Sequence, residues 1–131
     1  MLYGRKIIWT NGCFDVLHLG HAEMLKYAKS LGDELWVGID SDTRVKELKG
    51  ASRPINSECA RMMMLRHIKW VDKVFIFSND LQLDAMTKGA DEMVVGEEYR
   101  EKRIIGGKNV KYVHFFPRVG NFSTTGIINE S

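Results

Sequence analysis

The chain has 131 residues, of which 44% are hydrophobic and 27% charged, a composition typical of a globular domain rather than of a disordered or fibrous chain. Nineteen Lys and Arg residues against seventeen Asp and Glu residues give a net charge of +2 without a long basic run, so binding to nucleic acid or to a membrane surface through charge is not expected. We expect one cytoplasmic domain over residues 1–131, because the sequence shows no signal-peptide pattern, no apolar stretch near the ~20 residues of a membrane span, and only two cysteines, Cys13 and Cys59.

Five short apolar runs follow one another along the chain. They cover residues 6–10, 34–40, 73–77, 92–95 and 110–116. Continuous apolar runs of this length are typical of strands that are buried on both faces of a parallel sheet. Gly106 and Gly107 indicate a mobile surface loop before the last of these runs.

Helical patterns separate the runs. Apolar residues at helical spacing predict helices over 20–31, from about 56 to 68, and over 80–88, and Ser123 is placed to cap a last short helix. Because strands and helices alternate, we predict an α/β fold: a Rossmann-like five-stranded parallel sheet with helices on both faces.

The turn after the first predicted strand, residues 10–21 (TNGCFDVLHLGH), carries the clearest chemical pattern. His18 and His21 are three residues apart, so both rings project from one side of a helix start, and Gly20 permits close approach to the backbone. Imidazoles and free backbone N–H groups at a positive helix end suit a phosphate. Paired histidines also bind zinc, but no nearby carboxylate or Cys has the familiar spacing. A purely structural pair of histidines carries about equal weight on residue types alone.

Two segments of the chain resemble the signatures of a known family. Residues 12–21 (GCFDVLHLGH) resemble the G-x-F-D-x-x-H-x-G-H signature of the cytidylyltransferase-like nucleotidyltransferases, and residues 121–128 (NFSTTGII) resemble their S-T-T-x-I-I helix start. Residues 48–56 (LKGASRPIN) are similar to the nucleotidyltransferase domain of ADP-heptose synthase. Residues 68–74 and 116–118 are equally similar to the glycerol-3-phosphate and phosphoethanolamine cytidylyltransferases. The resemblance therefore covers nearly the whole chain.

This resemblance implies an enzyme that transfers a nucleotidyl group. A phosphomonoester attacks the α-phosphate of a nucleoside triphosphate, and pyrophosphate leaves. Because the nucleophile is already anionic, the site needs alignment and neutralisation of charge more than a strong base. The resemblance favours ATP and heptose 1-phosphate as substrates, with CTP and glycerol 3-phosphate as the alternative. A nucleotide-binding module without catalysis is a further alternative. It also implies Mg²⁺ bound through the triphosphate, with no metal site made by the protein alone, and a homodimer.

The resemblance assigns roles to individual residues. The catalytic residues are His18, His21, Lys49 and Arg118. The nucleotide-binding residues are Asn11, Gly12, Cys13, Phe14, Asp15, Gly20, Lys69, Glu97, Ser123, Thr124 and Thr125. The acceptor-binding residues are Asp42, Lys46 and Arg53. The residues alone give plainer interpretations for some of these, because Asp15 is placed to accept backbone N–H bonds, Ser123 to cap a helix, and the lysines to be solvated.

Overall fold

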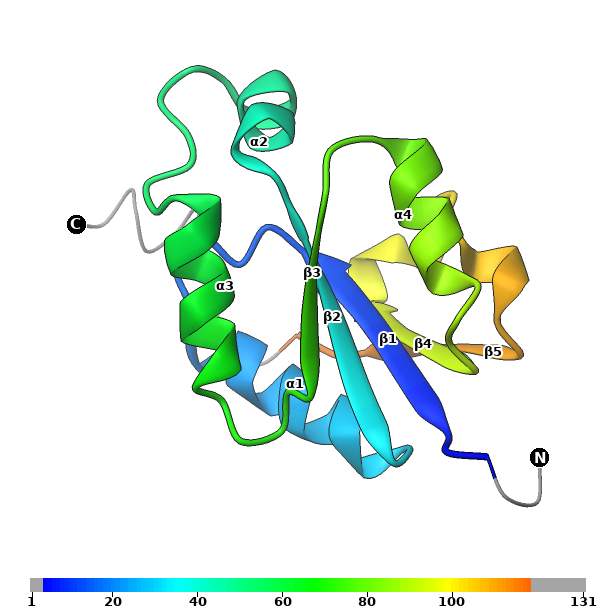
Figure 1. Ribbon diagram of the computed structural model, residues 1–131. Helices are drawn as coiled ribbons and strands as arrows, with labels where there is room; N and C mark the ends of the chain where they lie inside the picture. The colour runs from blue at the N-terminus through cyan, green and yellow to red at the C-terminus, as the bar shows by residue number, and fades with distance from the viewer. Residues whose placement is uncertain (1–3, 119–131) are drawn as a thin grey trace.

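The computed structural model describes residues 4–118 and forms a single parallel sheet of five strands (Figure 1). The strands are β1 (Ile7–Gly12), β2 (Glu34–Asp40), β3 (Lys73–Phe77), β4 (Glu92–Gly96) and β5 (Tyr112–Phe116). Their order in the sheet is β3-β2-β1-β4-β5. The prediction of a five-stranded parallel α/β sheet is confirmed.

The strand order reverses between β1 and β4. β1 pairs with β2 from Ile7 to Gly12, but it pairs with β4 only at Ile8 and Trp9. The carboxyl halves of β1 and β4 are therefore not hydrogen-bonded to one another. In open α/β sheets, a ligand binds at the carboxyl edge where the strand order reverses. The fold thus places a crevice directly after the first strand.

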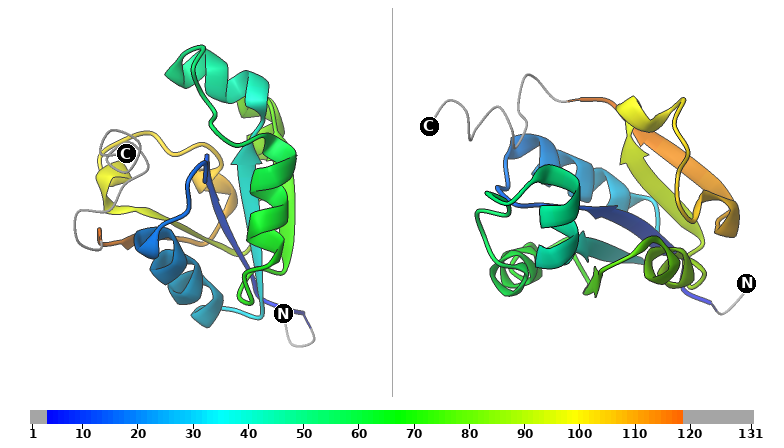
Figure 2. Two further views of the ribbon diagram at one scale, coloured as in Figure 1. Left: turned by 90° about the vertical axis from the view of Figure 1, so that its left-hand side faces the viewer. Right: turned by 90° about the horizontal axis from the view of Figure 1, so that it is seen from above.

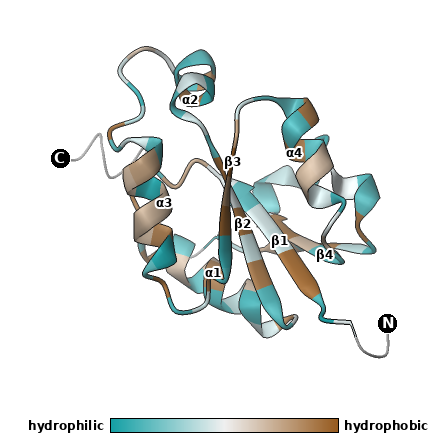
Figure 3. Cartoon of the chain, in the orientation of Figure 1, coloured by the Kyte–Doolittle hydropathy of each residue, from teal (hydrophilic) through white to brown (hydrophobic). Residues whose placement is uncertain are grey.

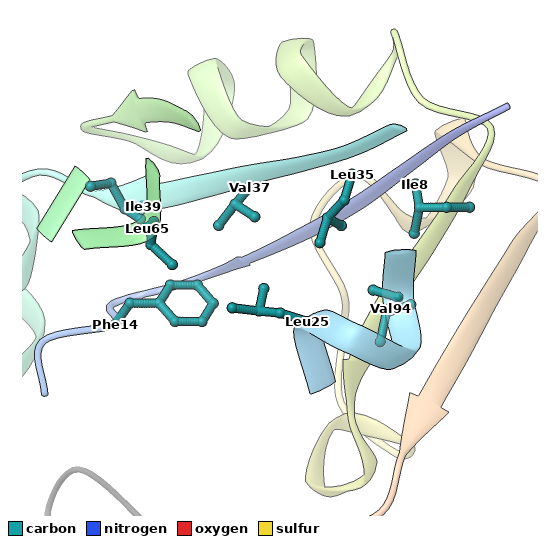
Figure 4. Packing of buried hydrophobic residues seen from close by; sticks show 9 residues of the cluster. Ile8, Phe14, Leu25, Leu35, Val37, Ile39, Leu65 and Val94 are labelled. Atoms are coloured by element: carbon teal, nitrogen blue, oxygen red, sulfur yellow. The ribbon is translucent and has the colours of Figure 1, made fainter. Parts of the chain in front are cut away.

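Helices cover both faces of the sheet, as predicted. The helices are α1 (Leu19–Ser30), α2 (Asp42–Lys49), α3 (Glu58–Arg66) and α4 (Asp80–Thr87), with two short 3₁₀ helices, η1 (Glu97–Tyr99) and η2 (Gly107–Asn109). On one face, Leu25 of α1 and Leu65 of α3 pack on strand residues such as Val37 (Figure 4). On the other face, Leu83 of α4 packs with Trp9. In Figure 3, brown segments lie along parts of β1, β2 and β3 and also on α3 and α4.

Helix α2 was not predicted from the sequence. The Ser41 side chain caps it by accepting a hydrogen bond from the Arg44 N–H, but Val45 is its only buried residue. A helix with one buried side chain has no apolar stripe for a sequence pattern to reveal. Helix α2 stands beyond the carboxyl edge of the sheet (Figure 2) and brings its last turn toward the crevice.

The segment around Gly106 is packed against α4, so the prediction of a surface loop there is wrong. Gly106 is buried and has a left-handed φ of 80°, and a Cβ at this position would lie 2.2 Å from Thr87 Oγ1. The Asn109 Nδ2 atom donates a hydrogen bond to Thr87 Oγ1 at 2.9 Å. Only glycine fits this close approach. Among the helices of residues 4–118, none is long and apolar enough to cross a membrane.

Candidate active site

The turn that follows β1 is held by two buried side chains. Phe14 adopts a left-handed φ of 51°, and its ring lies over Gly12, where a Cβ would come within 3.2 Å of the ring. Asp15 accepts hydrogen bonds from the backbone N–H groups of Ile55 and Asn56, both at 2.8 Å. These contacts fix the path of the chain from the end of β1 into α1.

The two histidines cap the start of α1 reciprocally. His18 is the N-cap residue, and its Nδ1 accepts a hydrogen bond from the Gly20 N–H at 3.1 Å. His21 Nδ1 accepts a hydrogen bond from the His18 N–H at 3.2 Å. This is the geometry of a capping box, built here from imidazoles. The rings stack with centroids 3.8 Å apart.

These two hydrogen bonds determine which nitrogen of each imidazole carries the proton. Because each Nδ1 accepts from a backbone N–H, the neutral rings carry their proton on Nε2. Burial, the neighbouring His18 ring and Lys49 lower the pKa of His21 to about 4. Burial and the charge of Arg118 lower the pKa of His18. At neutral pH the pair therefore presents two N–H donors without carrying its own positive charge.

The histidines line a cleft of about 840 Å³ at the carboxyl edge of the sheet. The side of the cleft near α1 contains the predicted nucleotide-binding residues Asn11, Gly12, Cys13, Phe14 and Gly20. Residues of the apolar cluster on the α4 face of the sheet also line the cleft, namely Phe77, Leu83, Ile104 and Ile105. A volume of this size lies within the range of small-molecule sites, roughly 300–1,000 Å³.

Two predicted catalytic cations reach the same cleft from different elements. Lys49 comes from the last turn of α2, and Arg118 follows β5. Glu97, at the end of β4, also lines the cleft, and its Oε1 accepts a hydrogen bond from the Arg118 N–H at 3.3 Å. The helix start with its two imidazoles, together with Lys49 and Arg118, forms a surface suited to several phosphate groups.

Arg44 is a cleft residue that the sequence analysis missed. Its Nε lies 2.8 Å from Asp40 Oδ1 and its Nη2 lies 2.8 Å from Asp80 Oδ1, while its guanidinium is 5.3 Å from the centre of the Phe77 ring. No helical spacing signalled this pair, because Asp40 is the last residue of β2 and Arg44 lies in α2. The arginine joins the end of β2 to the start of α4.

Arg61 is a second residue whose role was missed, and it is only 1% exposed. Its Nη1 donates to the backbone oxygens of Cys13 (3.0 Å) and Asp40 (2.6 Å). Its Nε donates to Asn56 O (3.0 Å), and its Nη2 lies 2.8 Å from Asp42 Oδ1. One side chain thus fastens the ends of β1 and β2, the start of α2 and the loop before α3 to each other.

Five of the predicted binding residues within residues 4–118 do not line the cleft, and four of them lie close to it in the chain's loops and in α2. Arg53 donates from Nε to Asp15 Oδ2 at 3.2 Å, so these two side chains hold the loop before α3 against the turn after β1. Burial alone would raise the pKa of Asp15, but the hydrogen bonds from Ile55, Asn56 and Arg53 lower it. Asp42 accepts from the Glu58 N–H at 2.7 Å as well as from Arg61. Lys46 is exposed on α2.

Lys69 lies near the amino edge of the sheet, opposite the carboxyl edge that carries the cleft. It follows α3, which runs from the carboxyl edge back toward the start of β3 at Lys73, and its Nζ lies 5.3 Å from the centre of the Trp70 ring. The structure therefore does not bring Lys69 to the histidines. Ser123, Thr124 and Thr125 lie outside the described residues.

Within residues 4–118 there is no group of three or more His, Cys, Asp or Glu side chains that could hold a metal ion. Cys13 and Cys59 are both free thiols, and burial raises the pKa of Cys13. The cleft is lined by imidazole, ammonium and guanidinium groups together with the carboxylates of Asp40, Glu97 and Glu98. The imidazole, ammonium and guanidinium groups are suited to phosphate oxygens.

Comparison with known proteins agrees with this chemistry. The family model described as cytidylyltransferase-like matches residues 9–129. The chain therefore belongs to the cytidylyltransferase-like family, and it is a nucleotidyltransferase. The resemblance inferred from the two signatures is confirmed.

Two relatives that match nearly the whole of this chain carry a more specific name than the family. The bifunctional protein HldE of Campylobacter concisus (strain 13826) is 46% identical over 127 residues, which are 96% of this chain and 27% of that protein. The bifunctional protein HldE of Campylobacter fetus subsp. fetus (strain 82-40) is 44% identical over 128 residues, 97% of this chain and 28% of that protein. The chain thus spans about a quarter of the length of these relatives.

A solved structure shares the fold. The lipopolysaccharide core biosynthesis protein from Thermoplasma volcanium GSS1 superimposes with a TM-score of 0.71 at 27% sequence identity, covering 89% of this chain and 100% of that chain.

Proposed function

We propose that the domain transfers the adenylyl group of ATP to heptose 1-phosphate, or to a closely similar sugar phosphate, with release of pyrophosphate. The observation that carries this proposal is the histidine capping box at the start of α1, which lines the cleft together with Lys49 and Arg118. Two comparisons support a sugar phosphate of the cell envelope as acceptor. They are the 46% sequence identity to a bifunctional protein HldE and the structural likeness to a lipopolysaccharide core biosynthesis protein.

In this proposal the chain's own residues act by alignment and charge. The Nε2–H groups of His18 and His21, at the positive end of α1, bind the α- and β-phosphate oxygens, where negative charge grows during transfer. Lys49 and Arg118 neutralise the acceptor phosphate and the leaving pyrophosphate. Mg²⁺ enters as the magnesium complex of the triphosphate and is held by phosphate oxygens and water.

The remaining roles complete the proposal. Asn11, Gly12, Gly20 and Glu97 contact the nucleotide, and Asp15 and Arg53 act by holding the turn that carries the histidines. The enzyme works in the cytoplasm as a homodimer.

The test is pyrophosphate release by the purified protein with each of the four nucleoside triphosphates and magnesium. Each triphosphate is combined with heptose 1-phosphate, glycerol 3-phosphate, phosphoethanolamine and a set of hexose 1-phosphates. We expect release that depends on ATP and heptose 1-phosphate together. Release with CTP and glycerol 3-phosphate instead would assign the alternative reaction. Binding of a triphosphate without turnover on any acceptor would indicate a nucleotide-binding module.

A further inference from the structure

A second hollow adjoins the cleft on the α4 face of the sheet. It has a volume of about 410 Å³ and lies between α4 and residues 103–108. Arg103, Ile104 and Ile105 line both this hollow and the cleft that contains the histidines. The two spaces are thus neighbours that share these three residues.

The hollow combines two kinds of polar group with an aliphatic wall. Asp80 and Asp84 supply carboxylates, Arg103 and Lys108 supply cations, and Leu81 lies among them. Each of the two carboxylates contacts a neighbouring polar side chain. Asp80 Oδ1 is 2.8 Å from Arg44 Nη2, and Asp84 Oδ1 accepts from Asn109 Nδ2 at 3.2 Å. The second oxygen of Asp84 lies 4.0 Å from Lys88 Nζ, and the Asp80 side chain is largely exposed. A carboxylate has several lone pairs, so each can still accept from a ligand hydroxyl beside these contacts.

This chemistry fits a polyhydroxyl ligand. A hydroxyl both donates and accepts a hydrogen bond, whereas a carboxylate only accepts and an ammonium or guanidinium only donates. A wall that alternates the two types can satisfy neighbouring hydroxyls of a sugar, and aliphatic side chains can pack on its C–H faces. A phosphate alone would not use the carboxylates, since like charges repel.

We infer that this hollow is the subsite for the sugar moiety of the acceptor, so that the enzyme selects sugar phosphates over three-carbon polyol phosphates. The inference rests on the proposed function, because the acceptor phosphate must lie in the cleft near Lys49 and the histidines. The ion pairs Asp40–Arg44 and Arg44–Asp80, both of 2.8 Å, run from the cleft to the hollow and fix the position of one wall relative to the other.

Two substitutions test the subsite without touching the histidines. Leu81 is 80% exposed, so Leu81→Trp adds bulk to the hollow without disturbing the core, and Lys108→Ala removes one cation. Matched controls are Met64→Trp on α3, where the methionine is 57% exposed, and Lys26→Ala on α1. Neither control residue lines the cleft or the hollow.

The measurements are KM for heptose 1-phosphate, KM for ATP, and the Kd of heptose 1-phosphate by calorimetry. For Lys108→Ala and Leu81→Trp, we expect KM and Kd for heptose 1-phosphate to rise about tenfold or more, because the first variant loses a hydrogen bond from a charged group and the second fills space that the sugar needs. KM for ATP and any turnover of glycerol 3-phosphate stay unchanged, and both controls behave as the wild type.

The outcomes separate this inference from the proposed function. If the wild type turns over heptose 1-phosphate and both variants keep its KM, the subsite is refuted and the function stands. If no acceptor is turned over, the Kd decides: weaker binding in the two variants than in the wild type supports the subsite. Absence of heptose 1-phosphate binding to the wild type overturns it, as does a wild-type preference for glycerol 3-phosphate.

Discussion

Replacement of Arg61 by Met is expected to destabilise the domain strongly. The side chain is 1% exposed and makes four hydrogen bonds of 2.6–3.0 Å, three to backbone oxygens and one to Asp42. Methionine fills a similar volume but leaves these oxygens without their donor. Each buried acceptor left without a donor costs about 1–3 kcal/mol, so the three backbone oxygens together account for a loss of about 3–5 kcal/mol in the free energy of unfolding. That is a large part of the roughly 5–15 kcal/mol available to a domain of this size.

Urea unfolding followed by tryptophan fluorescence measures this loss. Arg66→Met, at the exposed end of the same helix, is the matched control and is expected to change the free energy of unfolding by less than about 0.5 kcal/mol. Arg61→Lys keeps the charge but not the fork of donors, so it should fall between the two. A value for Arg61→Met within about 1 kcal/mol of the wild type would refute the argument that this side chain ties the carboxyl edge together.

Two further predictions follow from local geometry. The pKa of His21 is about 4 instead of the ordinary 6.5. Between these two pH values the unfolded chain binds a proton that the folded chain does not. The contribution of neutral His21 to the free energy of unfolding is therefore fully present above pH 6.5 and declines as the pH falls through this window. An NMR titration should find the His21 midpoint near 4, and a midpoint near 6.5 would contradict the burial described here. Gly106→Ala is expected to lower the free energy of unfolding by about 2 kcal/mol or more, since it adds a clash with Thr87 to backbone strain. A loss of less than about 1 kcal/mol for Gly106→Ala in thermal unfolding would argue against this packing.

The sequence predicted the elements whose residues form a continuous apolar run or follow a regular spacing. The five strands are continuous apolar runs, and the turn after β1 carries a spaced pair of histidines whose place at a helix start follows from the pattern itself. Helix α2 escaped prediction because it buries only Val45. Lys69 looked like a site residue from resemblance alone, although a helix that starts at the carboxyl edge must end at the other.

The buried Arg61 shows why other contacts around the site could not be predicted from the sequence. Arg61 lies on the same helical stripe as Leu65 and Ile68, at spacings of four and seven, so its burial had a signal in the sequence. Its partners did not, because Cys13, Asp40 and Asn56 are far apart in the chain and offer only backbone oxygens. A contact to the backbone leaves no trace in residue types. The same holds for Arg103, which joins two hollows only once the loop has folded onto α4.

The claim that the two imidazoles stabilise the transferring phosphates is tested most directly by a pair of substitutions at His21. In His21→Asn, the amide oxygen can still accept from the His18 N–H, so the helix cap survives while the donor at the Nε2 position is lost. His21→Gln places an amide N–H near that position. With the substrates that the wild type uses, we predict that kcat of His21→Asn falls about 10²–10³-fold while thermal stability is kept, and that His21→Gln regains part of the loss. A folded His21→Asn variant with wild-type kcat would contradict the account.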